Sequence, residues 1–305
     1  MSTGVYAKTA GDLIRDALRA ATISGISLPV ESDDFTQGET ALNDILMNLQ
    51  TKKVHIWSLT EALIPLNPNQ QKYVFGTDHA FTDYVYTTAI AALVGATALD
   101  VVSTVGMTNG DNIGVELSDG TRQWTTLTIV DSNTVTLGTA LTAAVDDLAG
   151  VYTYTTGIDQ PVRIESIRQA DSYTANEVTA SNVARDTYFN QSVKDATSST
   201  NMWHFSRQLE AGELYIWPVA DSCQRILRIT FIKPQYIPED QSDNILIPPE
   251  WYIALKFKLA ADLALIYNVD ANKQMMLEQK AAIYLQDAMD SDDDNTSFQF
   301  FPSNR

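Results

Sequence analysis

Histidine and cysteine, the residues that most often bind zinc or act as activated nucleophiles, are few and scattered in this sequence. His55, His79 and His204 lie far apart, and none belongs to an H-x-x-x-H motif or a Cys/His cluster. Zinc sites have close and regular ligand spacings, so the sequence predicts no metal site and no bound cofactor. The single cysteine, Cys223, excludes an internal disulfide and is expected to be a small buried apolar residue.

Acidic residues are abundant, and one run of them has the alternation of a calcium loop. Asp290, Asp292 and Asp294 alternate along the chain as loop ligands would. An EF-hand loop needs Gly at its sixth position and Glu at its twelfth; counted from Asp290, those positions hold Asn295 and Phe301. We therefore interpret the run as a solvated acidic link.

Catalytic motifs are absent, although one enzymatic alternative stays open. The sequence contains no G-x-S-x-G elbow, P-loop or G-x-G-x-x-G, which removes common hydrolase and nucleotide-binding patterns. A pair of carboxylates for glycoside cleavage remains an alternative, because acidic residues lie on or near predicted strands at Glu165, Glu177, Glu210 and Glu213. A general acid needs a carboxyl whose pKa is raised by burial, and the sequence identifies none. We expect no catalytic residue and no enzyme.

The tryptophans are the other candidate site residues. A sugar-stacking platform is one alternative, with Trp124 as the stacking residue. Large aromatic side chains at alternating or helical spacing lie more often in a core or at an interface. We predict that role for Trp57, Trp203, Trp217 and Trp251.

Composition limits the classes of partner. The chain has 305 residues, of which 45% are hydrophobic, enough for a substantial packed core. Its 38 acidic and 20 basic residues give a formal net charge of -18, which disfavours nonspecific attraction to nucleic acid and to anionic membranes. The charged first twenty residues lack the apolar core of a signal peptide. A globular protein folded in a reducing cytosol is expected.

Helical periodicity marks both ends of the chain. Leu13, Ile14, Ala17, Leu18 and Ala21 predict a short helix that stops at Ser24-Gly25, and a second helix carries Leu42, Ile45, Leu46 and Leu49. Pro248, Pro249 and Glu250 open a third helix with Leu255, Leu259, Leu263 and Ile266 on one side. A fourth is predicted from about Ala271 to Met289.

The middle of the chain has the sequence pattern of β-strands. It begins near Val54, includes QKYVFG, and resumes from PVRIESIRQ through GELYIWP to RILRITFIKP. Residues 86–156 are rich in Thr and Val, and their seven acidic residues face a lone Arg122. They predict a small all-β module inserted into a host domain.

The expected fold class is α+β. A helical bundle from the N- and C-terminal helices is expected to pack with an antiparallel β region, and the small barrel or sandwich is inserted into it. The predicted domains are residues 1–85 with 157–290, the module 86–156, and an acidic and aromatic tail 291–305.

Several stretches, in this order and spacing, resemble the head-to-tail adaptor proteins of short-tailed phages, also called tail accessory factors or portal-bound connectors. LIRDALRAATISG and ALNDILMNLQTKKVHIW are similar to the two leading helices of that family and the strand with Trp that follows them. QKYVFG, PVRIESIR and GELYIWP resemble its strands, and IPPEWYIALKFKLAADLALIY resembles its closing helix. These stretches cover most of residues 8–85 and 157–290, whereas the module 86–156 has no counterpart in the smaller members.

The resemblance implies a structural virion protein, made in the host cytoplasm, that forms a ring of typically twelve copies at the head-tail junction. Such a ring docks on the portal, extends the DNA channel and carries the nozzle, needle or fibre proteins during genome retention and ejection. An acidic lumen would let DNA slide without specific binding. No membrane is implied.

The tail adds a further hypothesis. Phe298, Phe300 and Phe301 follow the acidic link, and we expect them to lie as an arm against the portal or a neighbouring subunit. A tail folded back on its own body is the alternative. A peptidoglycan hydrolase and a receptor- or carbohydrate-binding tail module remain alternative functions of the chain.

Overall fold

The computed structural model describes residues 8–23, 31–50, 59–171, 176–209, 211–233, 238, 240, 242–245 and 247–291. The predictions for Trp57 and for Phe298, Phe300 and Phe301 fall outside these residues. The chain divides into two compact units, one of Met1–Ser58 with Pro234–Arg305 and one of Leu59–Lys233. We call them the helical unit and the β unit.

The helical unit contains the four helices that periodicity predicts: α1 (Ala10–Ala20), α2 (Ser32–Gln50), α4 (Pro249–Ile266) and α5 (Ala271–Ser291). Thr9 caps α1 by accepting a hydrogen bond from the backbone N–H of Asp12 at 3.1 Å. Pro249 lies in the first turn of α4, where its missing N–H costs no helical hydrogen bond. Among the described residues, no helix is apolar enough over sufficient length to span a bilayer.

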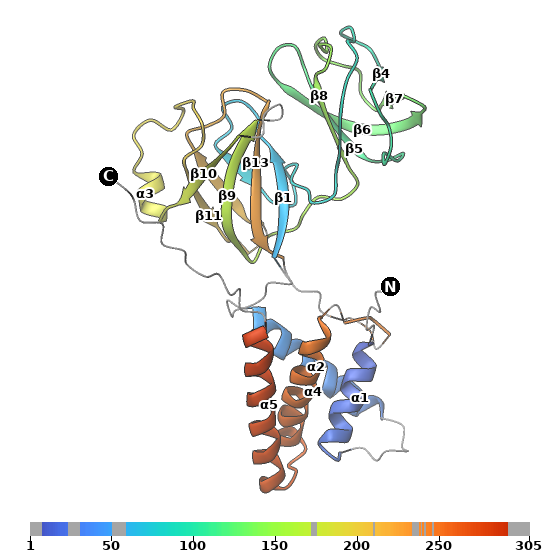
Figure 1. The fold of residues 1–305 in the computed structure, drawn as a ribbon, viewed down its shortest axis with the longest axis vertical. Helices are drawn as coiled ribbons and strands as arrows, with labels where there is room; N and C mark the ends of the chain where they lie inside the picture. The colour runs from blue at the N-terminus through green and yellow to red at the C-terminus, as the bar shows by residue number, and fades with distance from the viewer. Residues whose placement is uncertain are drawn as a thin grey trace, which may run out of the picture. The chain divides into compact units, whose positions relative to one another are not determined.

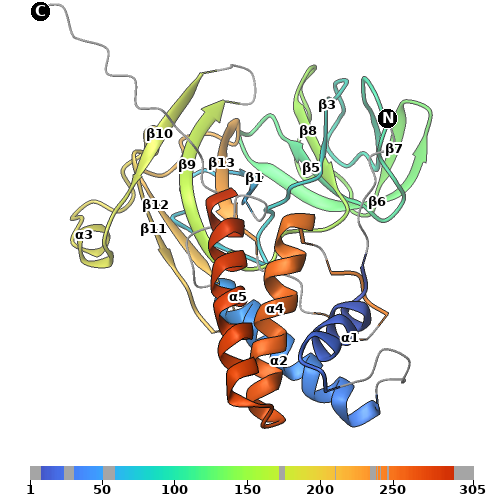
Figure 2. The ribbon, with the colours of Figure 1, turned by 60° about the horizontal axis from the view of Figure 1, so that its bottom comes forward.

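Helix α4 is the centre of this unit. It packs against α1, α2 and α5, and Figures 1 and 2 both show α4 and α5 side by side. Small side chains on α4 allow this close approach. Buried on it are Trp251, Tyr252, Ala254, Leu255, Leu259, Ala260, Ala261, Leu263 and Ala264.

The β unit contains a seven-stranded sheet whose two edge strands are neighbours in sequence. The spatial order is β1 (Leu59–Pro65), β13 (Arg225–Ile232), β9 (Arg163–Asp171), β10 (Glu177–Asn182), β11 (Met202–Ser206), β12 (Glu213–Trp217) and β2 (Lys72–Val74). Because residues 66–71 alone join edge strands β1 and β2, the sheet has to curl (Figure 1). Its buried core includes Ile64, Tyr73, Ile167, Trp203 and Phe231. The short helix α3 (Arg185–Phe189) follows β10.

A second, six-stranded sheet lies within residues 85–154 and has a core of its own. Its order is β3 (Val85–Thr88), β8 (Gly150–Tyr154), β5 (Asn112–Glu116), β6 (Arg122–Asp131), β7 (Thr134–Leu137) and β4 (Ala98–Asp100). All neighbouring strands are antiparallel. The β5–β6 turn places Gly120 at φ +83°, a conformation that favours glycine after Asp119. Buried in this sheet are Leu99, Ile113, Val115, Leu127, Val135 and Val151.

The expected fold class is wrong. The chain is mostly β, with thirteen strands in two curled sheets and only a few helices among the described residues. A helical bundle with a packed β region and a small barrel insert does not describe it. The helices gave strong periodic signals, whereas strands of three to five residues, such as β2, β3 and β4, carry little periodicity. The sequence interpretation therefore underestimated the β structure.

Candidate functional site

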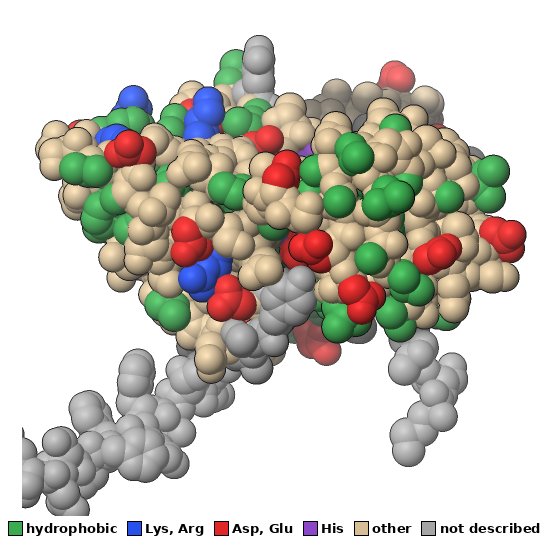
Figure 3. Space-filling model, turned by 90° about the horizontal axis from the view of Figure 1, so that it is seen from above, with side chains coloured by type: hydrophobic (Ala, Val, Ile, Leu, Met, Phe, Trp, Pro, Cys, Tyr) green, Lys and Arg blue, Asp and Glu red, His purple; other side chains and the backbone are tan. Residues whose placement is uncertain are grey.

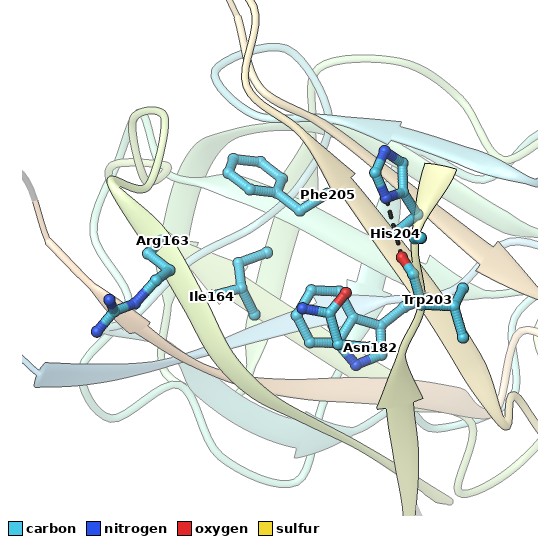
Figure 4. A pocket seen from close by; sticks show the side chains of 8 residues that line it. Arg163, Ile164, Asn182, Trp203, His204 and Phe205 are labelled. Carbon is cyan, nitrogen blue, oxygen red and sulfur yellow. Dashed lines mark hydrogen bonds between the residues drawn. The ribbon is translucent and has the colours of Figure 1, made fainter. Parts of the chain in front are cut away.

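A hollow of about 420 Å³ opens in the seven-stranded sheet, within the range of ordinary ligand pockets. We call it the strand slot and define it by its lining residues: Arg163, Ile164, Asn182, Val183, Ala184, Trp203, His204 and Phe205. These residues come from the start of β9, the end of β10 and the end of β11. Figure 4 shows Ile164, Asn182 and Phe205 around the hollow, with the Arg163 side chain pointing away.

The slot exists because β9 and β11 both extend beyond the point where β10 stops pairing with them. The antiparallel ladder between β9 and β10 ends at Ile167–Ala180. The parallel ladder between β10 and β11 has only two residue pairs, the last being Asn182–Trp203. Within the described part of the chain, no strand pairs with residues 163–166 or 204–206 on the slot side. Two strand edges therefore border one hollow.

The base of the slot is apolar and fixed in place. Ile164 and Trp203 are 4% and 2% exposed, and the indole N–H of Trp203 donates to the carbonyl oxygen of Ala180 at 3.2 Å. Phe205 packs edge-on against Phe75, with ring centroids 5.7 Å apart. A Cβ on Gly212 would lie 2.7 Å from the Phe205 ring, so the ring has little room to move away.

The polar groups of the slot are few. Nδ1 of His204 lies 3.1 Å from the carbonyl oxygen of Val183, a hydrogen bond drawn in Figure 4. Asn182 offers an exposed amide. No carboxylate, hydroxyl or thiol belongs to the lining. The slot therefore presents apolar surface and unpaired strand edges, as sites that bind peptides by strand addition do.

The predicted tryptophans lie in three environments. Trp203 belongs to the core of the seven-stranded sheet and contributes to the slot. Trp251, 1% exposed, lies in the first turn of α4 and in the helical core. Trp217 is half-buried at the end of β12, and its indole N–H donates to the carbonyl oxygen of Val193 at 2.7 Å.

Trp124, the candidate sugar platform, is engaged by protein side chains. The ring of His79 stacks on it at 3.8 Å with an interplanar angle of 12°. Tyr154 meets it edge-on at 5.7 Å, and Gly114, its cross-strand partner, lies so close that a Cβ there would be 2.6 Å from the ring. Trp124 therefore helps to join the two sheets. The face of its ring that His79 covers is closed to a sugar.

Two carboxylates elsewhere in the β unit, Asp111 and Glu213, have protein partners. Asp83 and Asp111 line a second hollow, where Asp111 accepts hydrogen bonds from the backbone N–H and the hydroxyl of Thr108 and from the hydroxyl of Thr155. The pKa of Glu213 is lowered by hydrogen bonds from Tyr215 and Lys72, the opposite of what a general acid needs. Among the described residues, no three His, Cys, Asp or Glu side chains are grouped to hold a metal ion.

Both units expose large apolar side chains. On the loops of the six-stranded sheet these are Ile90, Leu93, Val94, Val102, Val105 and Leu148, with Leu93 and Val105 80% and 83% exposed. Hydrophobic side chains gather over the half of Figure 3 that this sheet occupies. On helices α4 and α5 they are Ile253, Leu265, Ile266, Met275, Met276 and Ile283. Grouped apolar exposure marks contact surfaces more often than single exposed residues do.

Comparisons with known proteins give only distant similarity. No protein-family model and no curated protein matches the chain. The tailspike protein gp49 from Pseudomonas phage LKA1 is similar over 26% of this chain and 16% of its own length, with 22% identity and a TM-score of 0.22. VP17, a capsid protein of bacteriophage P23-77, is similar over 60% of this chain and 76% of its own, with 12% identity and a TM-score of 0.12. Both are phage proteins, but neither TM-score is high enough to show a shared fold.

Proposed function

We propose that this chain is a structural protein of a phage particle and acts, without catalysis, as a head-to-tail adaptor. Copies of it assemble into a ring that docks on the portal, extends the DNA channel and carries the nozzle or needle. The family resemblance of the sequence supports this proposal. The stretches that carry it include α1, α2, β9, β12 and α4 in the same chain order.

The observation that carries the proposal is the exposed apolar surface on both units of a chain with net charge -18. An acidic monomer gains solubility from its charge, whereas exposed Ile283, Met275 and Leu265 lower it. Burying such side chains against neighbouring subunits removes this cost, at roughly 25 cal/mol for each Å² of apolar surface. A ring requires heterologous contacts, in which two different surfaces of each copy meet.

The charge balance supports a role as a conduit. Carboxylates exceed basic side chains by 38 to 20, and an acidic lumen repels the phosphates of passing DNA. DNA would slide through such a ring without specific binding. The tail residues Phe298, Phe300 and Phe301 complete the proposed contacts, against the portal or a neighbouring copy.

Native mass measurement of the purified chain, alone and after mixing with the portal protein of the same phage, tests the proposal. We expect a large increase in mass of fixed stoichiometry on mixing. The variant Ile283→Glu, with a charge on the exposed face of α5, should weaken this association. The matched variant Gln37→Glu, which adds the same charge at an exposed position of α2, should not. Absence of association with the portal at any protein ratio would refute the adaptor function.

A further inference from the structure

We propose that the strand slot binds the segment Phe298–Phe301 of a second copy as an added strand between β9 and β11. This inference rests on the proposed function, because it requires copies to assemble. It assigns the tail a specific binding site on a neighbouring copy. The adaptor proposal alone does not choose between the portal and a neighbouring copy as the partner of the tail.

The backbone supports strand addition. Residues 163–166 of β9 and 204–206 of β11 present edges that no described strand pairs with on the slot side. An extended segment between them would satisfy backbone N–H and C=O groups on both sides, which a segment on an outer sheet edge cannot do. The sheet is also weakly paired beside the slot, since β10 and β11 are joined by only two parallel residue pairs.

The aromatic side chains of the tail segment also suit the apolar base of the slot. Phe298 and Phe300 are two residues apart, so in an extended segment both rings point to the same face. At the base of the slot Phe205 is partly exposed, and Ile164 and Trp203 lie almost fully buried beneath it. Aromatic side chains in a prepared apolar pocket are typical anchors of interfaces.

Charge and chain length agree with this occupant. Asp292, Asp293 and Asp294 precede the aromatic segment. Within two residues of the slot lining lie three arginines and two acidic residues, 3 minus 2 or a net charge of +1: Arg163, Arg185, Arg207, Glu165 and Asp186. Arg163 is paired with Glu165, which leaves Arg185 and Arg207 to attract the acidic link. Fourteen residues follow Ser291, where α5 ends. Extended at about 3.3 Å per residue, the six that separate Ser291 from Phe298 span about 20 Å, a reach that suits an arm extending to a neighbour.

The tail and the slot are different surfaces of the chain. Each copy can therefore insert its own tail into one neighbour and bind the tail of another neighbour in its slot. Such a heterologous contact repeats from copy to copy, and it forms a closed ring when the rotation between successive copies closes. Binding of the tail to the portal leaves the slot empty, whereas a tail in a neighbour's slot adds a contact between copies to those of the exposed apolar faces. The second copy is therefore the occupant that we propose, and disulfide trapping distinguishes it from a tail bound in the slot of its own copy.

Peptide binding tests the slot itself. The receptor is the full chain carrying Phe298→Ser, Phe300→Ser and Phe301→Ser, and the probe is a fluorescent peptide of residues 290–305. We expect saturable binding by anisotropy, no binding of the peptide with the same three substitutions, and about tenfold weaker binding when the receptor also carries Asn182→Trp, which fills the hollow. Thr179→Trp, on β10 but outside the slot, is the matched control. Equal binding by the Asn182→Trp and Thr179→Trp receptors would overturn the assignment.

Disulfide trapping then identifies the donor. Cys223 is 3% exposed, so the chain carrying Asn182→Cys and Phe300→Cys should form a new bond at those two positions. We expect covalent dimers and higher species, and none with Thr179→Cys in place of Asn182→Cys. A cross-linked product of monomer mass would mean that the tail folds onto its own copy, and it would refute the second-copy inference. Portal association, measured separately, can persist when the slot binds nothing, so failure of this inference is distinguishable from failure of the adaptor proposal.

Discussion

Arg122 of β6 and Glu116 of β5 form an ion pair inside the β unit. Nη2 of Arg122 lies 3.0 Å from Oε1 of Glu116, and the two side chains are 0% and 4% exposed. Arg122 also donates to the carbonyl oxygens of Leu66 and Cys223, which belong to loops of the seven-stranded sheet. A side chain of one sheet is thus bonded to the backbone of the other.

Replacing Arg122 by Met should destabilise the β unit strongly. The substitution leaves the Glu116 carboxylate buried without its counter-charge and removes two hydrogen bonds to loop carbonyls. A broken buried pair of this kind costs about 3–5 kcal/mol in free energy of unfolding. Chemical denaturation of the full chain, followed by circular dichroism, measures the loss.

The double variant Arg122→Met/Glu116→Gln removes the uncompensated charge and should lose less stability than the single variant. Arg163→Met is the surface control, since Arg163 and Glu165 are 38% and 39% exposed in their ion pair. Exposed pairs contribute at most about 1 kcal/mol. Equal losses for Arg122→Met and Arg163→Met would contradict this account of the sheet junction.

Gly114→Ala should destabilise the contact between the two sheets by overpacking. The new methyl would lie 2.6 Å from the Trp124 ring, which is held by His79 on one face. Overpacking of this kind costs about 1–3 kcal/mol. The test is non-additivity: in a Trp124→Leu background, where the ring is gone, Gly114→Ala should cost clearly less. A cost that is the same in both backgrounds would show that the methyl does not meet the ring.

The helices were predictable because their evidence is local. Leu13, Ile14 and Leu18 form one face of α1 in the sequence and one buried face in the structure. The strands were recognisable from their sequence pattern, but the pairing between them depends on residues far apart in the chain. Strand β1 pairs with β13 over a separation of more than 160 residues, and no short-range pattern specifies such a partner. The helical signal therefore dominated the expected fold class, which was wrong.

The slot was not predictable, because it is a property of register. Asn182 and His204 border it only because the β10 ladders end where they do, and neither residue belongs to a motif. One signal for the sheet junction was present in the sequence. Arg122 is the sole basic residue among seven acidic ones in residues 86–156, and a lone charge of this kind is a candidate for a buried ion pair.

Tyr252→Phe should weaken the attachment of α1 to α4 in the helical unit. The Tyr252 hydroxyl donates to Oδ2 of Asp16 at 2.8 Å, and Lys8 donates to the same oxygen at 3.0 Å. Losing one such hydrogen bond costs about 0.5–1.5 kcal/mol. Tyr284→Phe keeps the stacking of that ring on Phe257 at 5.1 Å and serves as the control, with an expected change within about 0.5 kcal/mol. Thermal unfolding compares the two variants, and a larger loss for Tyr284→Phe would refute the assignment.

Acid should destabilise the sheet junction through His79. Burial, opposed in part by the charge of Asp78, lowers the pKa of His79 from 6.5 to about 4, and its Nδ1 lies 2.6 Å from the Tyr154 hydroxyl. Between pH 6.5 and 4 the unfolded chain binds a proton that the folded chain does not, so the free energy of unfolding falls as the pH falls through this window. Below pH 4 both states are protonated at this site and the loss stops.

The variant His79→Gln keeps a neutral polar side chain at this position and cannot take up the proton. Carboxylates also titrate in the same range, so the informative quantity is the difference between wild type and variant at each pH. We expect the wild type to lose more stability than the variant between pH 6.5 and 4, corresponding to uptake of up to about one additional proton on unfolding. Urea denaturation at intervals across this range measures that difference, and parallel curves would show that His79 titrates alike in the folded and unfolded states.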